Sequence, residues 1–180
     1  TLFVRIVGGG DEVGKLRIMT VYALCICFLL FPLNTLAATI IIDPGHGGHD
    51  PGAVGVNGLK EKDVNLDISL KLRKELQARG HQVIMTRETD KFLSLQERVR
   101  IARASDGELF ISVHANAHNN KQARGTLVLY YDQRYPQAAY PASREMTMLS
   151  DENYMLASLV QDGMVAARGT QYRCLVPSSV

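Results

Sequence analysis

The sequence has little net charge, few cysteines and no internal repeat. Its 20 lysines and arginines nearly balance 18 aspartates and glutamates, which leaves a formal charge of +2. Because these charges are interspersed, they form no basic cluster, and we expect no nucleic-acid partner. Two of the three cysteines, Cys25 and Cys27, lie in an N-terminal apolar run, so Cys174 has no intramolecular partner once that run is removed. With 46% hydrophobic residues among 180, the chain is long enough for one domain with a core.

The N-terminal apolar run is shorter than a typical membrane-spanning helix. It extends over residues 21–31, whereas a spanning helix needs roughly 20 apolar residues. Lys15 and Arg17 precede it, and the small residue Ala38 lies at the expected cleavage position. We therefore predict an N-terminal extension and secretion signal over residues 1–38 and a folded domain over 39–180, with no stable membrane association after cleavage. An uncleaved anchor is the alternative.

The central stretch of the chain, residues 39–63, begins with a β-branched run and continues into a glycine-rich loop. The run Thr39–Ile42 predicts a buried strand, and Pro44 is expected to end it because proline has no N–H to donate. His46 then lies on the loop at the carboxyl end of the strand, where open α/β sheets bind their ligands. The loop leads to Glu61, which lies at the start of a predicted helix.

A second apolar strand, residues 109–113, ends directly in His114. Periodicity also predicts strands at 82–86 and 125–131 and helices at 62–79, 95–104 and 154–168. This alternation predicts a single α/β domain with a mostly parallel, twisted sheet flanked by helices. In such a sheet, His46 and His114 emerge from the same edge.

Two imidazoles and one carboxylate are a suitable ligand set for zinc, and three protein ligands leave the fourth position open for chemistry. His46, Glu61 and His114 are therefore the candidate set. The alternative is that the histidines are ordinary loop residues and that Glu61 interacts with a helix N-terminus. His49 and His118 are competing candidates, since His118 follows His114 by four positions.

Other polar residues have interpretations without chemistry. Arg87 and Asp90 follow a predicted strand and are read as part of a turn, and the arginines of the 95–104 helix, Arg98 among them, as a solvated face. The apolar residues of that helix are assigned to the core. Asn116 is a candidate for substrate binding, although asparagine in a loop commonly bonds the local backbone.

Four motifs, in order, resemble the zinc-dependent N-acetylmuramoyl-L-alanine amidases that cleave bacterial peptidoglycan: IIIDPGHGGHDPGAVG, EKDVNLDISLKLRKEL, TRETDKFLSLQERVRIA and LFISVHANA. The resemblance implies that His46, Glu61 and His114 hold one Zn²⁺ ion. It also implies hydrolysis of the amide bond between N-acetylmuramic acid and L-alanine, with peptidoglycan as partner, in the periplasm or cell-wall space after secretion.

The resemblance also predicts that the last strand of the domain and its general base are missing from this sequence. The family's general-base glutamate lies on its last strand, and CLVPSSV at the C-terminus resembles the stretch just before it. We therefore expect the general base to lie beyond Val180 and the domain to lack its last strand, which makes inactivity of this chain one expectation. The alternatives are a catalytically inactive, zinc-containing module that binds peptidoglycan, and a different zinc hydrolase on the same scaffold.

Overall fold

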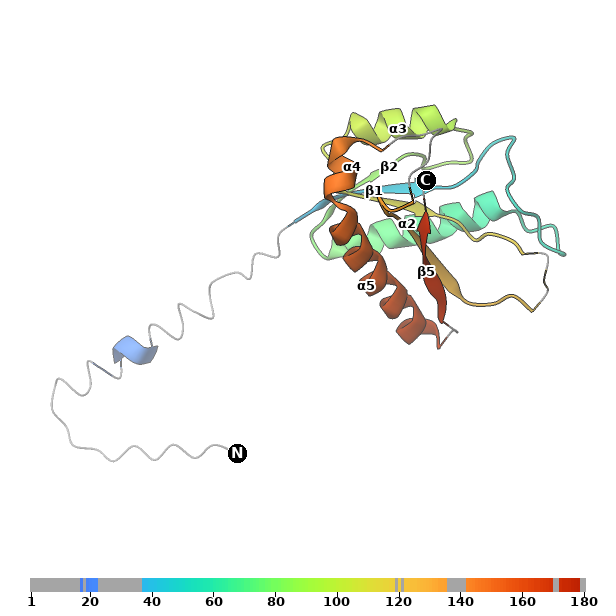
Figure 1. Ribbon diagram of the computed structural model, residues 1–180. Helices are drawn as coiled ribbons and strands as arrows, with labels where there is room; N and C mark the ends of the chain where they lie inside the picture. Colours follow the sequence, from blue (N-terminus) through green and yellow to red (C-terminus); the bar gives the residue numbers. More distant parts are fainter. Residues whose placement is uncertain are drawn as a thin grey trace. The chain divides into compact units, whose positions relative to one another are not determined.

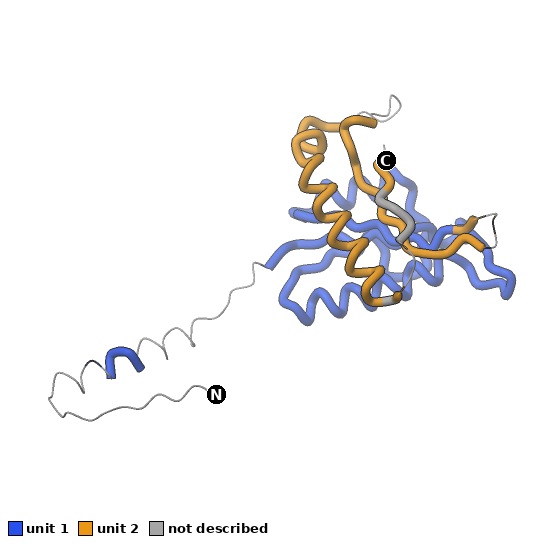
Figure 2. Tube along the Cα trace, turned by 60° about the horizontal axis from the view of Figure 1, so that its bottom comes forward, with its two compact units in different colours: residues 1–116 blue, residues 117–180 orange. Residues whose placement is uncertain are grey.

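A computed structural model describes residues 17, 19–22, 37–118, 120, 122–135, 142–169 and 172–178. The chain divides into two compact units, Thr1–Asn116 and Ala117–Val180 (Figure 2). Most of the predicted secretion signal lies outside the described residues, so the boundary at residue 38 stays a prediction. Within the described part of the chain, no helix has both the length and the hydropathy to span a membrane.

The first unit is built on a three-stranded parallel sheet (Figure 1). Its central strand, β1 (Thr39–Pro44), lies between β2 (Gln82–Met85) and β3 (Leu109–Val113). Both neighbours pair with β1 in parallel. The isoleucines of β1 are at most 4% exposed and form the core, as a β-branched run covered on both faces requires. The predicted parallel α/β arrangement is confirmed.

The central strand is two residues longer than predicted. It continues through Pro44, which is opposite Val113 in the register. Proline is accommodated because it is the last residue of the strand, and the next N–H, that of Gly45, donates to the carbonyl of Val113 at 3.0 Å. The interstrand pairing therefore extends up to the residue that precedes His46.

Two helices flank the sheet in Figure 1, α2 (Glu61–Ala78) and α3 (Leu95–Arg103). The helix α3 begins with a capping box, in which Ser94 Oγ accepts from the N–H of Glu97 and the Glu97 carboxylate accepts from the N–H of Ser94. Chain reversal after α2 occurs at Gly80, whose φ of +89° suits glycine.

The buried faces of both helices differ from the prediction. In α2 the buried residues are polar, namely Glu61, Lys62, Asn65 and Ser69. In α3 the buried residue is Arg98, whereas Leu95 is 72% exposed. The assignment of Arg98 to a solvated face and of Leu95 to the core is wrong, because the helix turns toward the polar end of β1 and not toward its apolar centre.

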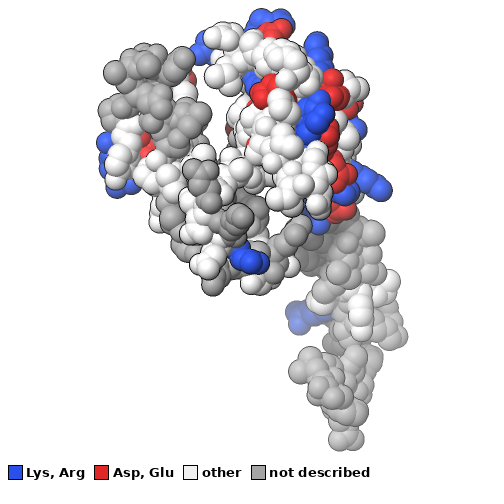
Figure 3. Space-filling view, turned by 90° about the vertical axis from the view of Figure 1, so that its right-hand side faces the viewer, with Lys and Arg blue, Asp and Glu red and all other residues white. Residues whose placement is uncertain are grey.

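Charged residues of opposite sign are interspersed on the face shown in Figure 3. Along α2, Lys71 pairs with Asp67 at 2.6 Å and Arg79 with Glu75 at 2.9 Å. Each of these exposed pairs joins residues four positions apart and stabilises the helix by about 0.3 kcal/mol.

The second unit contains a two-stranded parallel sheet of β4 (Thr126–Tyr131) and β5 (Tyr172–Ser178). The helix α5 (Ser150–Arg168) packs on β4, and Gln161 Nε2 donates to the Thr126 carbonyl at 3.0 Å. A short helix, α4 (Arg144–Met148), precedes α5.

Two of these elements were not predicted. The strand β5 falls on the segment that includes Pro177, and a proline argues against a strand unless it lies at a sheet edge. The helix α4 lies in a polar stretch for which no element was predicted. It begins after Ser143, whose hydroxyl accepts from the N–H of Met146 at 3.2 Å. Whether a further strand completes the fold stays a prediction.

Candidate metal centre

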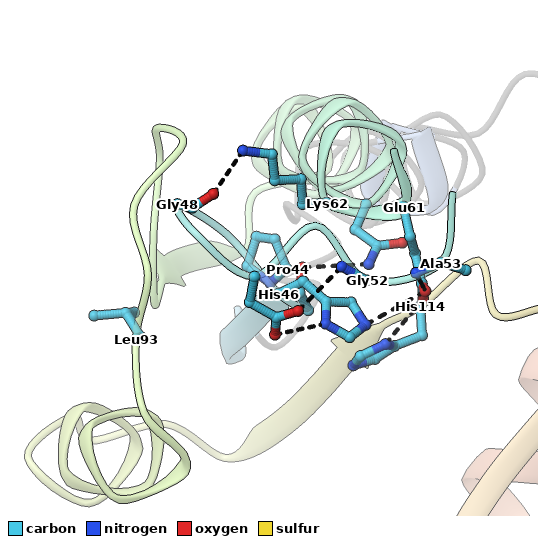
Figure 4. Close-up of polar contacts among 12 residues, drawn as sticks. Pro44, His46, Gly48, Gly52, Ala53, Glu61, Lys62, Leu93 and His114 are labelled. Atoms are coloured by element: carbon cyan, nitrogen blue, oxygen red, sulfur yellow. Dashed lines mark hydrogen bonds and ion pairs between the residues drawn. The ribbon is translucent and has the colours of Figure 1, made fainter. Parts of the chain in front are cut away.

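The two predicted histidines lie at one edge of the sheet because parallel strands place their carboxyl ends together. His46 follows β1 and His114 follows β3 directly. Their ring centroids are 4.9 Å apart, with the ring planes at 80° (Figure 4). Residues separated by 68 positions in sequence therefore lie side by side.

Glu61 lies between the two imidazoles as the first residue of α2. Its Oε1 is 3.1 Å from His114 Nδ1, and its Oε2 is 3.4 Å from His46 Nε2. One ligand atom from each of the three residues lies within 4.8 Å of the others. The structure thus brings all three predicted ligand residues into one cluster, with their polar atoms facing a common point.

The carboxylate of Glu61 is anionic and rigidly held. Burial raises its pKa, but the N–H groups of Ala53 at 2.9 Å and Asn116 at 3.0 Å, together with His114, outweigh this effect and lower the pKa to about 2. A buried, ionised carboxylate beside two imidazole nitrogens suits a divalent cation.

Asp50 orients the ring of His46. Its Oδ2 contacts His46 Nδ1 at 2.8 Å, and its Oδ1 accepts from the N–H of Gly52 at 3.1 Å. These bonds lower the pKa of Asp50, which therefore stays ionised. With Nδ1 engaged in this way, His46 presents Nε2 to the cluster, as expected of a metal-binding histidine with a carboxylate partner.

Two glycines provide the space in which the rings lie. A Cβ added to Gly45 would lie 2.2 Å from His114 Cε1, and one added to Gly52 would lie 2.6 Å from His46 Cδ2. Gly52 also has a φ of +64°, which glycine adopts at no steric cost. The glycine-rich sequence around His46 is therefore a packing requirement of the cluster.

Asn116 contacts the cluster through its backbone. It has a φ of +53°, and its N–H donates to Glu61 Oε1, while the residue itself is exposed. A role of its side chain in binding substrate stays a prediction.

The two competing histidines lie elsewhere. His49 stacks on Phe92 with ring centroids 4.0 Å apart, and His118 Nδ1 accepts from the N–H of Asn120 at 2.9 Å. Among the described residues, neither joins the group formed by His46, Glu61 and His114.

Sequence reasoning missed two buried arginines behind this cluster, Arg87 and Arg98. Arg98 Nη1 pairs with Asp43 at 2.6 Å. Arg87, read as part of a turn, is 3% exposed and donates to backbone carbonyls. A signal was available in the position of Asp43, since a carboxylate directly after a buried apolar strand requires a buried cation or several donors.

The matching sequence profile is that of a family described as N-acetylmuramoyl-L-alanine amidase, and it covers residues 40–180. The amidase LytC of Bacillus subtilis is 42% identical over 135 residues, which are 75% of this chain and 24% of LytC. The amidase AmiC of Neisseria meningitidis is 47% identical over 93 residues, which are 52% of this chain and 22% of AmiC. The chain thus spans about a quarter of the length of these relatives.

Among solved structures, the amidase AmiC2 of Nostoc punctiforme superposes with a TM-score of 0.66 at 33% identity. The similarity covers 79% of this chain and 70% of that structure.

Proposed function

The chain belongs to the N-acetylmuramoyl-L-alanine amidase family over residues 40–180, and from this membership we propose that it hydrolyses peptidoglycan. The bond cleaved is the amide between N-acetylmuramic acid and L-alanine. The observation that carries this proposal is the convergence of His46, Glu61 and His114 within the matched region. Because peptidoglycan is the substrate, we place the protein in the periplasm or cell-wall space.

The cluster fits one zinc ion. Two ligands of a tetrahedral zinc site, each about 2.0–2.2 Å from the metal, are roughly 3.3–3.5 Å from one another. Glu61 Oε1 is 3.1 Å from His114 Nδ1 and Glu61 Oε2 is 3.4 Å from His46 Nε2, both close to this spacing. One ligand atom of each of the three residues lies within 4.8 Å of the other two. A zinc ion held there supplies Lewis acidity, which activates water and polarises an amide carbonyl.

The residues of the chain have distinct tasks in this proposal. His46 presents Nε2 and His114 presents Nδ1, and Glu61 supplies the negative charge. Asp50 holds the ring of His46 through Nδ1 at 2.8 Å. The partial exposure of the histidines, 25% and 38% for their side chains, leaves the cluster open to a polymeric substrate.

Hydrolysis also requires a group that accepts the proton of the attacking water. Among the described residues, two carboxylates contact His46 and His114, those of Asp50 and Glu61, and both have a lowered pKa. Such groups are weak bases at neutral pH. The prediction of a glutamate beyond Val180 as general base therefore stays part of the proposal.

The lowered pKa values of Asp50 and Glu61 favour a second candidate function. A chain that holds zinc without an effective base would bind peptidoglycan and not cleave it. The experiment that separates the two is incubation of the zinc-loaded chain with purified peptidoglycan, followed by mass spectrometry of the soluble products. The proposed amidase releases stem peptides with a free N-terminal alanine and leaves glycan strands without peptide.

The outcomes are distinct for each function. Binding to peptidoglycan with no released peptide would exclude the amidase and support the binding module. Cleavage inside the stem peptide would indicate a peptidase. His114→Ala serves as the control, because it removes one proposed ligand while Glu61 and His46 remain in the chain, and release must disappear with it.

A further inference from the structure

The backbone that carries His46 is held by two buried guanidinium groups. Arg98 Nη1 donates to the carbonyl of Pro44 at 2.8 Å, and its Nη2 donates to the carbonyl of His46 at 2.8 Å. Arg87 donates to the carbonyls of Pro44 and Gly45, both at 2.9 Å. Three consecutive carbonyls, from the end of β1 to His46, thus accept charge-assisted hydrogen bonds.

The charge balance of this arrangement depends on Asp43. Its Oδ1 accepts from Arg98 at 2.6 Å and from Thr86 Oγ1 at 2.6 Å, and its Oδ2 accepts from Ser112 Oγ at 2.9 Å. Arg87 has no such carboxylate contact among the described residues, and its hydrogen bonds go to backbone carbonyls. Burial and the charge of Arg98 lower the pKa of Arg87.

The conformation of His46 explains why such support is needed. Its φ is +59°, in the left-handed region that residues other than glycine rarely adopt. This conformation persists only where the surroundings hold it, because the Cβ of a residue other than glycine crowds the backbone there. Arg98 holds the carbonyl of His46, and Asp50 holds its ring at Nδ1.

We propose that Arg98 is a positioning residue for His46, which fixes the backbone so that Nε2 points at the metal site. The inference rests on the proposed zinc site. Arg98 contacts the carbonyl of His46, a proposed ligand residue, and does not contact substrate or metal. Loss of the contact would free the His46 backbone to leave the left-handed conformation and carry the ring away from Glu61 and His114.

The competing interpretation is that Arg98 only stabilises the fold by neutralising Asp43. Arg98→Lys in the full chain separates the two, because lysine keeps a positive charge for Asp43 but has a single nitrogen and lacks the Nη2 group that donates to the His46 carbonyl. Thr86→Val is the matched control. It removes a 2.6 Å hydrogen bond from the same buried carboxylate without any contact to His46.

The measurement is zinc affinity of the metal-free chain, by competition with a chromophoric chelator, together with the visible absorption spectrum of the Co²⁺ form. We expect Arg98→Lys to weaken zinc binding by about 10- to 100-fold, the range found when a partner of a metal ligand is removed. The cobalt spectrum should change with it. Thr86→Val should lower the unfolding temperature and leave zinc affinity within about twofold of the wild type, well below that range.

Wild-type zinc affinity and an unchanged cobalt spectrum in a folded Arg98→Lys chain would overturn the inference. If that variant does not unfold cooperatively, the double variant Arg98→Met with Asp43→Asn replaces it, since it removes both charges of the Arg98–Asp43 pair together. Neither readout uses hydrolysis, so a chain that binds zinc but releases no peptide would refute the amidase proposal alone. A wild-type chain that binds no zinc would refute both.

Discussion

Gly45→Ala tests whether the packing around His114 sets the geometry of the metal centre. The new Cβ would lie 2.2 Å from Cε1 and 2.3 Å from Nε2 of the His114 ring. Ordinary contact begins at 3.4 Å, so the ring must move by about 1.2 Å. Zinc ligands tolerate deviations of roughly 0.2 Å from their normal distances. The displaced ring can then no longer bind the metal together with Glu61 and His46.

The expected magnitude follows from this displacement. Zinc affinity should fall at least about 100-fold, or about 3 kcal/mol. This is the largest loss typical of removing a residue that only hydrogen-bonds to a metal ligand. The free energy of unfolding of the metal-free chain should fall by only about 1 kcal/mol, which is the smallest loss typical of an overpacked site. The loss is small because the His114 side chain is 38% exposed and can turn toward solvent. Chelator competition and urea unfolding measure the two quantities.

Gly55→Ala is the matched control for this substitution. It lies in the loop before Glu61, and its added Cβ would meet Leu59 atoms at 3.6 Å and 3.9 Å, which is ordinary contact. Zinc affinity should be unchanged in this variant. A folded Gly45→Ala chain that binds zinc as tightly as the Gly55→Ala chain would show that His114 does not need its present position, and would refute the geometric argument.

Three further predictions concern single residues. The metal-free protein should lose about 3 kcal/mol of stability as the pH falls from 4.5 toward 2, because the lowered pKa of Glu61 stabilises the fold only while its carboxylate is ionised. In acid titrations of unfolding, Glu61→Gln should lack this pH-dependent loss. An identical pH profile for the variant and the wild type would contradict the assignment. His118→Ala should keep the wild-type zinc content measured by mass spectrometry, whereas His114→Ala should lose it; the reverse result would exchange their roles. Gly163→Ala in α5 should raise the free energy of unfolding by about 1 kcal/mol in urea titrations, because alanine favours a helix over glycine and the added Cβ would meet no atom within 4 Å. A decrease would reveal a contact that the structure lacks.

The elements that hold the site could be predicted because each depends on a local pattern. The β-branched run at Thr39–Ile42 indicated the central strand, and the position of His114 directly after an apolar strand indicated the same sheet edge. The parallel arrangement then followed from alternating strands and helices. The convergence of His46, Glu61 and His114 was therefore accessible from the sequence, whereas their role in metal binding stays a proposal.

The buried polar contacts could not be predicted from periodicity. An amphipathic pattern assigns apolar residues to the core, yet α2 buries Asn65 and Ser69, and α3 buries Arg98. Asn65 and Arg98 face the polar end of β1, where backbone carbonyls need donors. Asn65 Nδ2, for example, donates to the Gly45 carbonyl at 3.3 Å. Such contacts depend on tertiary placement, which overrides the hydrophobic pattern of a single helix.

The strand β5 was missed for a different reason. No strand was predicted over its sequence, which contains Pro177. In the structure it pairs in parallel with β4, with Pro177 opposite Tyr130. A strand that pairs with one neighbour leaves half of its backbone groups outside the ladder, and proline can occupy such a position.

Anomalous diffraction at the zinc absorption edge, from crystals of the chain grown with zinc, tests the central claim most directly. The account predicts one strong peak within bonding distance of His46 Nε2, His114 Nδ1 and a Glu61 oxygen, at about 2.0–2.2 Å. A peak bound instead by His49 or His118, or no peak beside Glu61 with zinc in excess, would contradict it.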